Sequence, residues 1–340
     1  IKKKVLSVWQ STQIPAKIVS VKYGKGIIYR GGNLNKYAPG EIYPSYDATK
    51  AILKQMNITE DFTTTGEVRY IHKTLANKDI YFVSNRTNQP QQADCTFRIT
   101  KGFAELWDPI NGKSYSLSQS KTEGGKTTIS LDFDRYQSYF IVFSETTDNN
   151  LPAFKSPLQT SVVQELTGDW QLAFDPRWGG PESITFSSLD DWSKRPEEGI
   201  KYYSGIATYK KTFTYTGNKT NTELFIDLGE VNNMAKVKLN GKDLGILWTA
   251  PWRIDITSAV KPGENQLEIE VANLWANRLI GDENYPDDGV KDKKWPEWLL
   301  NNQPRPSQRY TFTTHRYYKK DMPLLKSGLI GPVRILKSGE

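Results

Sequence analysis

Short runs of alternating apolar and polar residues, separated by turn signals, fill most of the sequence. Between Gly66 and Phe143 such runs recur at a spacing of roughly 10 residues, and they read EVRYIHK, DIYFVSN, ADCTFRI, FAELWDP, TTISLDF and SYFIVFS. Successive side chains of a strand point to opposite faces, so each run can bury only one face. Two sheets must therefore pack face to face, and the pattern predicts a small antiparallel β-sandwich over residues 63–148.

The turn residues predict which of these runs form hairpins. Asp108-Pro109 and Asn111-Gly112 should close one hairpin of the small sandwich, and KTEGGK should close another. Cys95 lies within an alternating run, so we expect it to be a packing residue in a strand. His72 should also lie in a strand, with a local hydrogen-bond partner.

A second β-domain is predicted after the polar, proline-containing stretch TTDNNLPAFKSP, with a linker at residues 149–160 and the domain at 161–340. The strand count and the lack of a long helical pattern favour a jelly roll. Asn240-Gly241 predicts a hairpin, and Pro262-Gly263 predicts a turn. The expected strands lie in TGDWQLAFDP, ESITFSS, GIATYKKTFTY, TELFIDLGEV, MAKVKLNGKDLGIL, WRIDIT, NQLEIEVAN, RYTFTTH and GPVRIL.

Residues 1–62 predict an incomplete α/β unit, so the expected fold class is mainly β with a short α/β remnant at the N-terminus. Two β-rich runs are hinged at Gly24 and Gly26, and a helix should follow with Ser45 or Asp47 as its N-cap. The remnant is either the end of an upstream domain or an element packed on the next domain. The chain begins at Ile1 without a Met or a signal-like region, and we expect it to be part of a longer polypeptide.

Composition narrows the classes of function. The 45 Lys and Arg residues are interspersed with 38 Asp and Glu residues, which gives a net charge of +7 without the basic stripe expected of a nucleic-acid-binding protein. One cysteine and two histidines exclude an internal disulfide and leave almost no material for a zinc site. No apolar run approaches the roughly 18 residues that a membrane span needs.

The stretch NLWANRLIGDENYPDD, which follows the predicted strand NQLEIEVA, breaks the strand pattern. Leu267, Ile269 and Val271 share one face of an extended chain, and counting on by twos places Asn273, Trp275 and Asn277 on the same face. We expect this row to emerge from the core into a cleft at the end of the sheet. Arg278 and Asp282 either contribute to that cleft or pair with each other to fix the loop 281–306.

Tryptophans are concentrated in the second β-domain, which holds eight of the ten. Indole rings stack on the apolar face of a sugar ring, so tryptophans on loops favour a carbohydrate site. Trp170 and Trp192 should be core residues, whereas Trp295 and Trp298 fit either role. The predicted carbohydrate-binding residues are Trp248, Trp252, Asn273, Trp275, Asn277, Arg278 and Asp282.

The sequence does not identify catalytic residues or a metal site. A glycosidase needs two carboxylates about 5 to 10 Å apart, and the many Asp and Glu residues of the second domain do not single out a pair. The stretch DENYPDDGVKD has enough acids for calcium but lacks the spacing of an EF-hand loop. A bound calcium ion and a solvated loop both remain open, and no other cofactor is expected.

Three stretches carry a resemblance to a known family: YYSGIATYKKTF, then LFIDLGEVNNMAKVKLNGKDLGILWTAPWRIDITSAVKPGENQLEIEVANLWANRLIGD, then SGLIGPVRI. They resemble the galactose-binding-like jelly roll of large glycoside hydrolases, in particular the C-terminal region of bacterial α-L-rhamnosidase-like enzymes. The Y-x-G-x-A-x-Y strand and the V-x-L-N-G hairpin are shared with the sugar-binding domain of β-galactosidase and β-glucuronidase relatives. The resemblance covers residues 160–340, and to a lesser degree IYFVSNR to ELWDP.

In these enzymes the catalytic carboxylates and a calcium ion belong to an upstream (β/α)₈ barrel, and no such strand–helix alternation occurs here. The resemblance therefore implies an accessory part of a glycan-degrading hydrolase that supports the barrel and contributes to carbohydrate binding. It also implies a plant or microbial glycan as partner, and a secreted, periplasmic or cell-envelope location. The alternatives are a stand-alone carbohydrate-binding module and a structural or adhesion sandwich.

Overall fold

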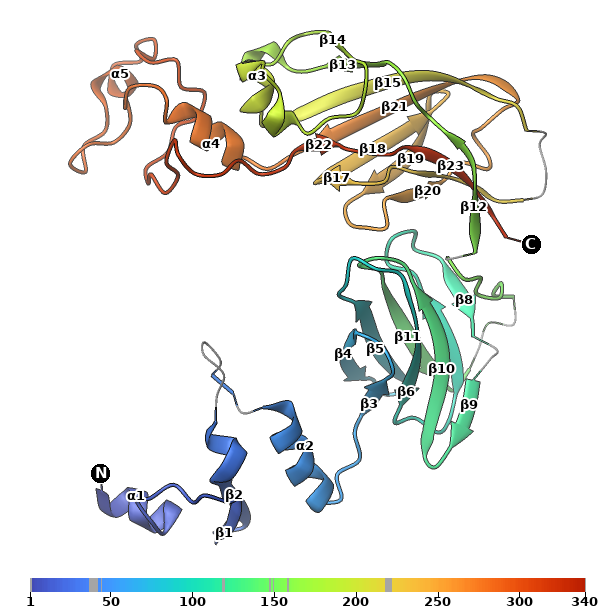
Figure 1. Cartoon of the computed structure of the whole chain (residues 1–340), viewed down its shortest axis with the longest axis vertical. Coiled ribbons are helices and arrows are strands. Elements are labelled where there is room, and N and C mark those ends of the chain that lie inside the picture. The colour runs from blue at the N-terminus through green and yellow to red at the C-terminus, as the bar shows by residue number, and fades with distance from the viewer. Residues whose placement is uncertain are drawn as a thin grey trace. The chain divides into compact units, whose positions relative to one another are not determined.

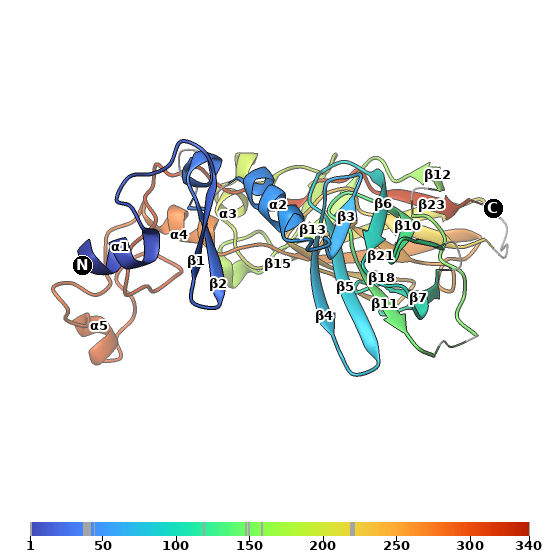
Figure 2. The same cartoon turned by 90° about the horizontal axis from the view of Figure 1, so that it is seen from below.

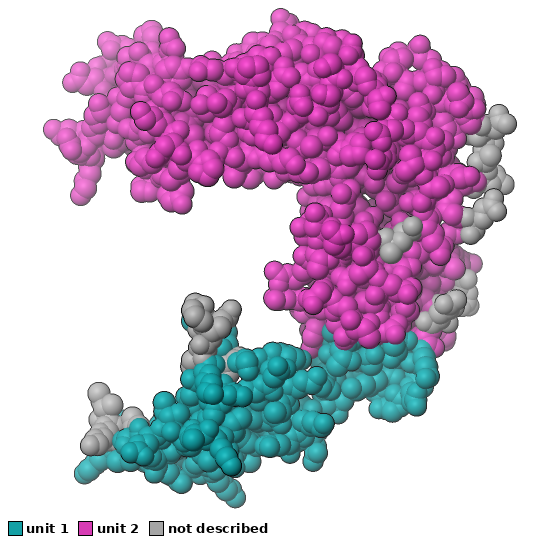
Figure 3. Space-filling model, in the orientation of Figure 1, with its two compact units in different colours: residues 1–63, 96–100, 121–128 teal, residues 64–95, 101–120, 129–340 magenta. Residues whose placement is uncertain are grey.

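The computed structural model describes residues 2–36, 42–43, 45–117, 120–146, 148, 150–157, 159–217 and 222–339. The chain divides into two compact units, which Figure 3 distinguishes by colour. Unit 1 comprises residues 1–63, 96–100 and 121–128, and unit 2 comprises residues 64–95, 101–120 and 129–340. No helix within these described ranges has the length and apolar character to cross a membrane.

Unit 1 begins with a helix, a hairpin and a second helix, in that order. The elements are α1 (Lys2–Trp9), β1 (Val19–Tyr23), β2 (Gly26–Arg30), the 3-10 turn η1 (Gly32–Asn35) and α2 (Tyr46–Gln55). The predicted hairpin is confirmed, and Gly24 at its turn has a φ of 59°, which glycine adopts without steric cost. Of the two predicted N-caps, Ser45 is the one found, and its hydroxyl accepts a hydrogen bond from the Ala48 backbone N–H at 3.4 Å. Helix α1 was not predicted.

The small sandwich consists of two antiparallel sheets. Their strand orders are β4-β5-β11-β7-β8 and β3-β6-β10-β9. The six runs predicted as strands form β4, β5, β6, β7, β10 and β11, and both predicted hairpins are present. Figure 2 shows β4 and β5 as a long hairpin. The strands are β3 (Phe62–Thr64), β4 (Val68–Thr74), β5 (Lys78–Asn85), β6 (Gln91–Phe97), β7 (Phe103–Trp107), β8 (Ser114–Ser116), β9 (Ser120–Glu123), β10 (Lys126–Phe133) and β11 (Ser138–Ser144).

Two side chains of the sandwich occupy the positions that the sequence predicted. His72 on β4 lies 3.0 Å from the Asp79 carboxylate on the neighbouring strand β5. Cys95 on β6 is fully buried, with its Sγ 4.0 Å from the Thr64 hydroxyl. Burial raises the pKa of the Cys95 thiol to about 12.

The C-terminal half is a jelly roll of two main sheets (Figure 1). The strand orders are β12-β23-β16-β20 and β14-β13-β15-β21-β18-β19, with a small third pair, β17-β22. The bounds are β12 (Thr160–Glu165), β13 (Trp170–Ala173), β14 (Ile184–Phe186), β15 (Ile206–Tyr215), β16 (Leu224–Asp227), β17 (Val231–Asn232), β18 (Met234–Leu239), β19 (Lys242–Leu247), β20 (Arg253–Asp255), β21 (Gly263–Ala272), β22 (Gly328–Leu329) and β23 (Arg334–Ser338). The mainly β fold class is confirmed, while the residue bounds of the individual domains remain a prediction.

The core of the jelly roll lies between its two main sheets and contains both tryptophans that were predicted to be core residues. Trp170 and Trp192 are buried, and the Trp192 indole N–H donates to the Tyr209 hydroxyl at 2.7 Å. The same hydroxyl accepts the Leu329 backbone N–H at 3.1 Å. This paired polar group links the wider sheet to β22 inside the core.

The six-stranded sheet, called the wider sheet here, has a polar outer face, and its two edge strands are short or irregular. Lys238 on β18 bridges Glu268 and Glu270 on β21, at 2.9 and 3.2 Å. One edge strand, β14, has three residues. The other, β19, pairs with β18 through the predicted Asn240-Gly241 hairpin, and the register shifts between Val237 and Lys238.

Five short helical segments accompany the jelly roll, and one predicted strand is absent. The segments are η2 (Pro176–Trp178), η3 (Trp192–Lys194), α3 (Glu198–Lys201), α4 (Ala276–Asp282) and α5 (Glu297–Leu300). The strand predicted in RYTFTTH, residues 309–315, is wrong, because no part of it is assigned as strand. The backbone N–H groups of Tyr310 and Thr311 donate to the Asp282 carboxylate instead of to a neighbouring strand.

An ion pair joins the small sandwich to the jelly roll within unit 2. Arg253 on β20 donates to the Asp134 carboxylate at 3.1 Å and to the Pro157 carbonyl at 2.9 Å. Asp227 lies 3.5 Å from the same guanidinium. Arg135, the residue after Asp134, donates to the Gly229 carbonyl at 2.9 Å.

Cys95 should be inert in the folded protein, because it is buried and the high pKa leaves almost no thiolate at neutral pH. Titration with a chromogenic disulfide reagent should detect no thiol in the native protein and one thiol after denaturation. Rapid modification under native conditions would contradict this expectation.

Candidate functional site

The core row of β21 does not continue into a cleft as the alternation predicted. Leu267, Ile269 and Val271 are buried as expected, but β21 ends at Ala272. The Asn273 side chain then binds backbone outside the ladder, where it accepts from the Gly205 N–H at 3.0 Å and donates to the Tyr203 carbonyl at 2.8 Å.

The residues after Asn273 turn into helix α4. Trp275 has helical dihedral angles, with φ −68° and ψ −18°, and stands at the N-terminal cap of α4. Asn277 therefore lies in a helix, and its predicted place in an extended row is wrong. Figure 1 shows α4 beside α3 at one end of the long strands β15 and β21.

Asn277 fixes α4 to a distant backbone segment. It is buried, and its amide makes two hydrogen bonds with Leu325: the Leu325 N–H donates to Oδ1 at 2.8 Å, and Nδ2 donates to the Leu325 carbonyl at 2.7 Å. Nδ2 also lies 3.0 Å from the Ser327 hydroxyl. With both ends of the amide engaged, Asn277 has a structural role here.

Arg278 and Asp282 fix the other side of α4. The predicted pairing is confirmed, with 3.9 Å between Arg278 Nη1 and Asp282 Oδ1 and both side chains buried. Arg278 Nε donates to the Tyr202 carbonyl at 2.8 Å, and its guanidinium lies 4.5 Å from the centre of the Tyr310 ring. Asp282 accepts the Thr311 N–H at 2.7 Å and the Thr311 hydroxyl at 2.6 Å.

The acidic stretch that had suggested calcium is neutralised by arginines. Arg305 Nε donates to Asp288 at 2.6 Å, and this hydrogen bond holds the pKa of Asp288 at about 2. Glu283 pairs with Arg309 at 2.9 Å and also with Arg316. Across the described residues, no group of three or more His, Cys, Asp or Glu side chains is placed to hold a metal ion. The carboxylates of this stretch are therefore a poor fit for calcium.

Trp275 is the predicted residue of this segment that faces solvent most. Its side chain is 53% exposed, and its ring packs edge to face on Trp178 at 5.3 Å between centroids. The neighbouring Leu274 is 51% exposed. The ring against Trp275 is thus Trp178, and neither Trp248 nor Trp252 lies against it in the ring contacts of the described residues.

Trp248 and Trp252 line a separate cleft of about 510 Å³ within unit 2. The jelly roll also contributes Gly229 to Asn233, Thr249 and Ala250, and the small sandwich contributes Asn88, Arg135 and Tyr136. The sequence did not identify the residues from the sandwich or from the 229–233 loop. These residues lie on turns far apart in the chain. Tyr136 has a φ of 54°, and no sequence pattern around it predicts that turn.

The charged residues of this cleft are paired. Glu230 accepts from Lys326 Nζ at 2.7 Å and from the Asn232 amide at 3.3 Å. Burial raises the pKa of Glu230, but these hydrogen bonds outweigh burial and hold the pKa below its ordinary value. Arg135 donates to the Gly229 carbonyl and lies 3.9 Å from Asp227.

Several uncharged polar groups of the cleft remain available. The amides of Asn88 and Asn233, the Tyr136 hydroxyl and the indole N–H groups of Trp248 and Trp252 form no hydrogen bond with any other described residue. Trp248 is 54% exposed and Tyr136 is 48% exposed. Flat aromatic faces beside free amides suit a ligand with both C–H and hydroxyl groups.

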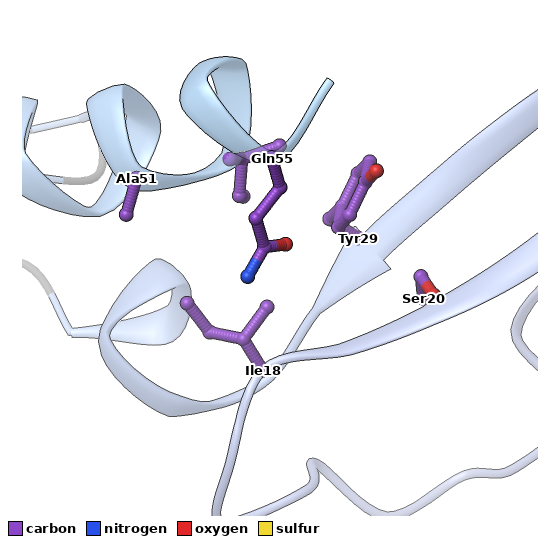
Figure 4. Close-up of a pocket in the computed structure, with 6 residues that line it drawn as sticks. Ile18, Ser20, Tyr29, Ala51 and Gln55 are labelled. Atoms are coloured by element: carbon purple, nitrogen blue, oxygen red, sulfur yellow. The ribbon is translucent and has the colours of Figure 1, made fainter. Parts of the chain in front are cut away.

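A smaller pocket of about 110 Å³ lies in unit 1 between the β1–β2 hairpin and α2 (Figure 4). Ile18, Ser20, Tyr29, Ala51 and Gln55 are among the residues that line it. Its volume is below the range of about 300 to 1,000 Å³ that is usual for small-molecule sites. We do not regard it as the functional site.

Two family models match the chain. The α-L-rhamnosidase model matches residues 14–121, and the glycosyl hydrolase 2 galactose-binding domain-like model matches residues 197–312. The second match includes the β15, β18 and β21 strands of the jelly roll, and the loops that carry Trp248, Trp252 and Trp275.

Two known proteins with names of glycoside hydrolases are similar to the chain. A rhamnosidase structure from Novosphingobium sp. PP1Y aligns with 99% of this chain at 33% identity and a TM-score of 0.67. A protein described as a putative β-glucuronidase, from Formosa agariphila, is 49% identical over 176 residues, which are 50% of this chain. The chain spans 28% of the rhamnosidase and 15% of the putative β-glucuronidase.

The expected resemblance is thus confirmed: residues 14–121 are similar to the α-L-rhamnosidase family, and residues 197–312 are similar to the galactose-binding-like domain of glycosyl hydrolase 2.

Proposed function

We propose that this chain is the non-catalytic part of a glycan-degrading glycoside hydrolase, where it supports an upstream catalytic barrel and contributes to carbohydrate binding. The observation that carries the proposal is the open apolar surface of residues 2–63. Among the described non-glycine residues there, only Ala48 and Phe62 are buried.

That surface needs a cover. Ile14, Ile27, Tyr46 and Met56 are 69%, 55%, 72% and 46% exposed. A lone two-stranded hairpin is at best marginally stable in water, and contiguous exposed apolar surface marks an interaction site. Residues 14–121 match the α-L-rhamnosidase family model, so we infer that the cover is the catalytic barrel of the same polypeptide.

The carbohydrate-binding role rests on the exposed tryptophans of the jelly roll. We assign sugar contact to Trp248 and Trp275, which are 54% and 53% exposed, and to Trp252, which lines the cleft but packs in part against the core. Asn273, Asn277, Arg278 and Asp282 are given the supporting role of holding the loops and α4 in place, because their polar atoms already bind protein backbone. A glycan partner in a secreted, periplasmic or cell-envelope setting fits these assignments.

A stand-alone carbohydrate-binding module is the second candidate, favoured by the same exposed tryptophans. It does not account for the uncovered apolar residues of unit 1. A structural or adhesion sandwich would cover them with a separate protein, whereas the α-L-rhamnosidase match of residues 14–121 favours a cover from the same polypeptide.

Ile27→Asp should separate these candidates. In the full polypeptide with its upstream region, a charge at an interface position should lower the thermal midpoint and the hydrolytic rate, while the 340-residue chain should unfold as before because Ile27 is exposed in it. Ile71→Asp is the matched control, since Ile71 is 68% exposed on β4 in unit 2. Equal behaviour of the two variants in the full polypeptide would contradict barrel support.

The 340-residue chain by itself should not hydrolyse glycosides, because no barrel sets the spacing and pKa values of two carboxylates. Aryl rhamnosides, galactosides and glucuronides can be assayed with purified protein. Turnover that a single carboxylate substitution abolishes would overturn the proposal.

Asp282→Ala should act mainly on folding. Loss of Asp282 leaves Arg278 buried without its carboxylate, and should cost about 3 to 5 kcal/mol of unfolding free energy in urea denaturation.

Trp275→Ala should act mainly on function. Loss of the exposed Trp275 ring should cost about 1 kcal/mol of stability and roughly 1 to 3 kcal/mol in sugar binding or transition-state stabilisation by the full enzyme. Urea denaturation and enzyme kinetics test both. A large stability loss for Trp275→Ala with unchanged kinetics would assign Trp275 to architecture.

A further inference from the structure

We propose that the cleft lined by Trp248 and Trp252 is a subsite for a neutral sugar ring, and that it selects against sugars bearing a carboxylate or sulfate. This deepens the proposed function, on which it rests, by naming the ligand class of one site and by adding residues of the small sandwich to it.

The cleft is held open by contacts that do not involve its free polar groups. The turn that carries Arg135 and Tyr136 is fixed to the jelly roll by the Arg135 hydrogen bond to the Gly229 carbonyl. A neighbouring ion pair, Arg253–Asp134 at 3.1 Å, also joins this turn to the jelly roll. The volume of about 510 Å³ lies within the usual range for small-molecule sites.

The groups left over match the surface of a pyranose ring. Trp248 and Tyr136 are about half exposed and offer aromatic faces to the ring C–H groups. The amides of Asn88 and Asn233 offer both donors and acceptors, which hydroxyl groups need because each can donate and accept.

The charges argue for a neutral ligand. Glu230 is paired with Lys326 at 2.7 Å, and Arg135 is paired with the Gly229 carbonyl and Asp227. Arg135 is the one cation among the described lining residues, and it already has a carboxylate partner in Asp227. A carboxylate or sulfate that entered would lose water without gaining a counter-ion, and this loss is costly.

Binding to the 340-residue chain tests the site directly. Titration calorimetry should show methyl β-D-glucoside binding, with Kd on the order of 1 mM, and the same assay can include methyl α-L-rhamnoside and methyl β-D-galactoside. Methyl β-D-glucuronide, which differs from methyl β-D-glucoside by its carboxylate alone, should bind at least about tenfold more weakly. Equal or tighter binding of the glucuronide, or no binding of any neutral glycoside, would overturn the inference.

Two variants locate the binding in the cleft. Trp248→Ala should weaken neutral-sugar binding at least about tenfold, as expected for an aromatic anchor. Trp295→Ala is the control, because Trp295 is 51% exposed but lies outside the cleft, where it stacks on Phe312. Equal losses, or a loss confined to Trp295→Ala, would refute the assignment.

Glu230→Gln tests the charge argument. Removing this carboxylate leaves Lys326 without its partner beside the cleft, so the affinity for methyl β-D-glucuronide should rise several-fold. No gain would show that paired charges do not set the selectivity. Failure of these binding tests would leave the Ile27→Asp comparison untouched, so the subsite and the barrel-supporting role can fail separately.

Discussion

The ion pair between Arg253 and Asp134 is the contact on which the arrangement of the candidate site depends. Arg253 follows Trp252 in the chain, and Asp134 precedes Arg135 and Tyr136, so one charged contact sets the position of both walls of the cleft. The Arg253 Nε is buried without a hydrogen-bond partner in the described structure. A largely buried pair of this kind gains little net stability, but loss of one partner is costly because the other charge is then left without a counter-ion.

The segment from Asn273 to Asp282 shows how polar residues at the end of a strand can serve architecture. Each of its buried polar side chains satisfies backbone groups of a separate loop, so that α4, the Leu325 region and Thr311 form one connected network. Loops have backbone groups that no ladder satisfies, and buried side chains must then supply the missing partners. The exposed Trp275 stands at the start of α4, which this network holds in place, but its side chain takes no part in these hydrogen bonds.

The sequence could predict what depends on local pattern. Alternation identified the strands around Cys95 and Leu267, and the Asn240-Gly241 and Ser45 signals identified a turn and a cap. Counting by twos failed after Ala272, because alternation does not reveal where a ladder ends. The sequence marked Trp248 and Trp252 as candidates because they lie on loops, and their role stays a prediction. Tyr136 and Glu230 join them in one cleft only through tertiary packing, which a local pattern does not reveal.

The edges of the wider jelly-roll sheet bear on how the protein behaves at high concentration. An open sheet edge is a template for strands of other molecules, and nature blunts such edges with short strands, bulges and charges. Here one edge is the three-residue β14. The other is β19, where the register shift after Val237 interrupts the ladder and Asp243, paired with Lys236 at 3.1 Å, places a charge on the edge strand. The two open edges of this six-stranded sheet are thus poor templates for a strand from a neighbouring molecule, which protects the protein from edge-to-edge aggregation.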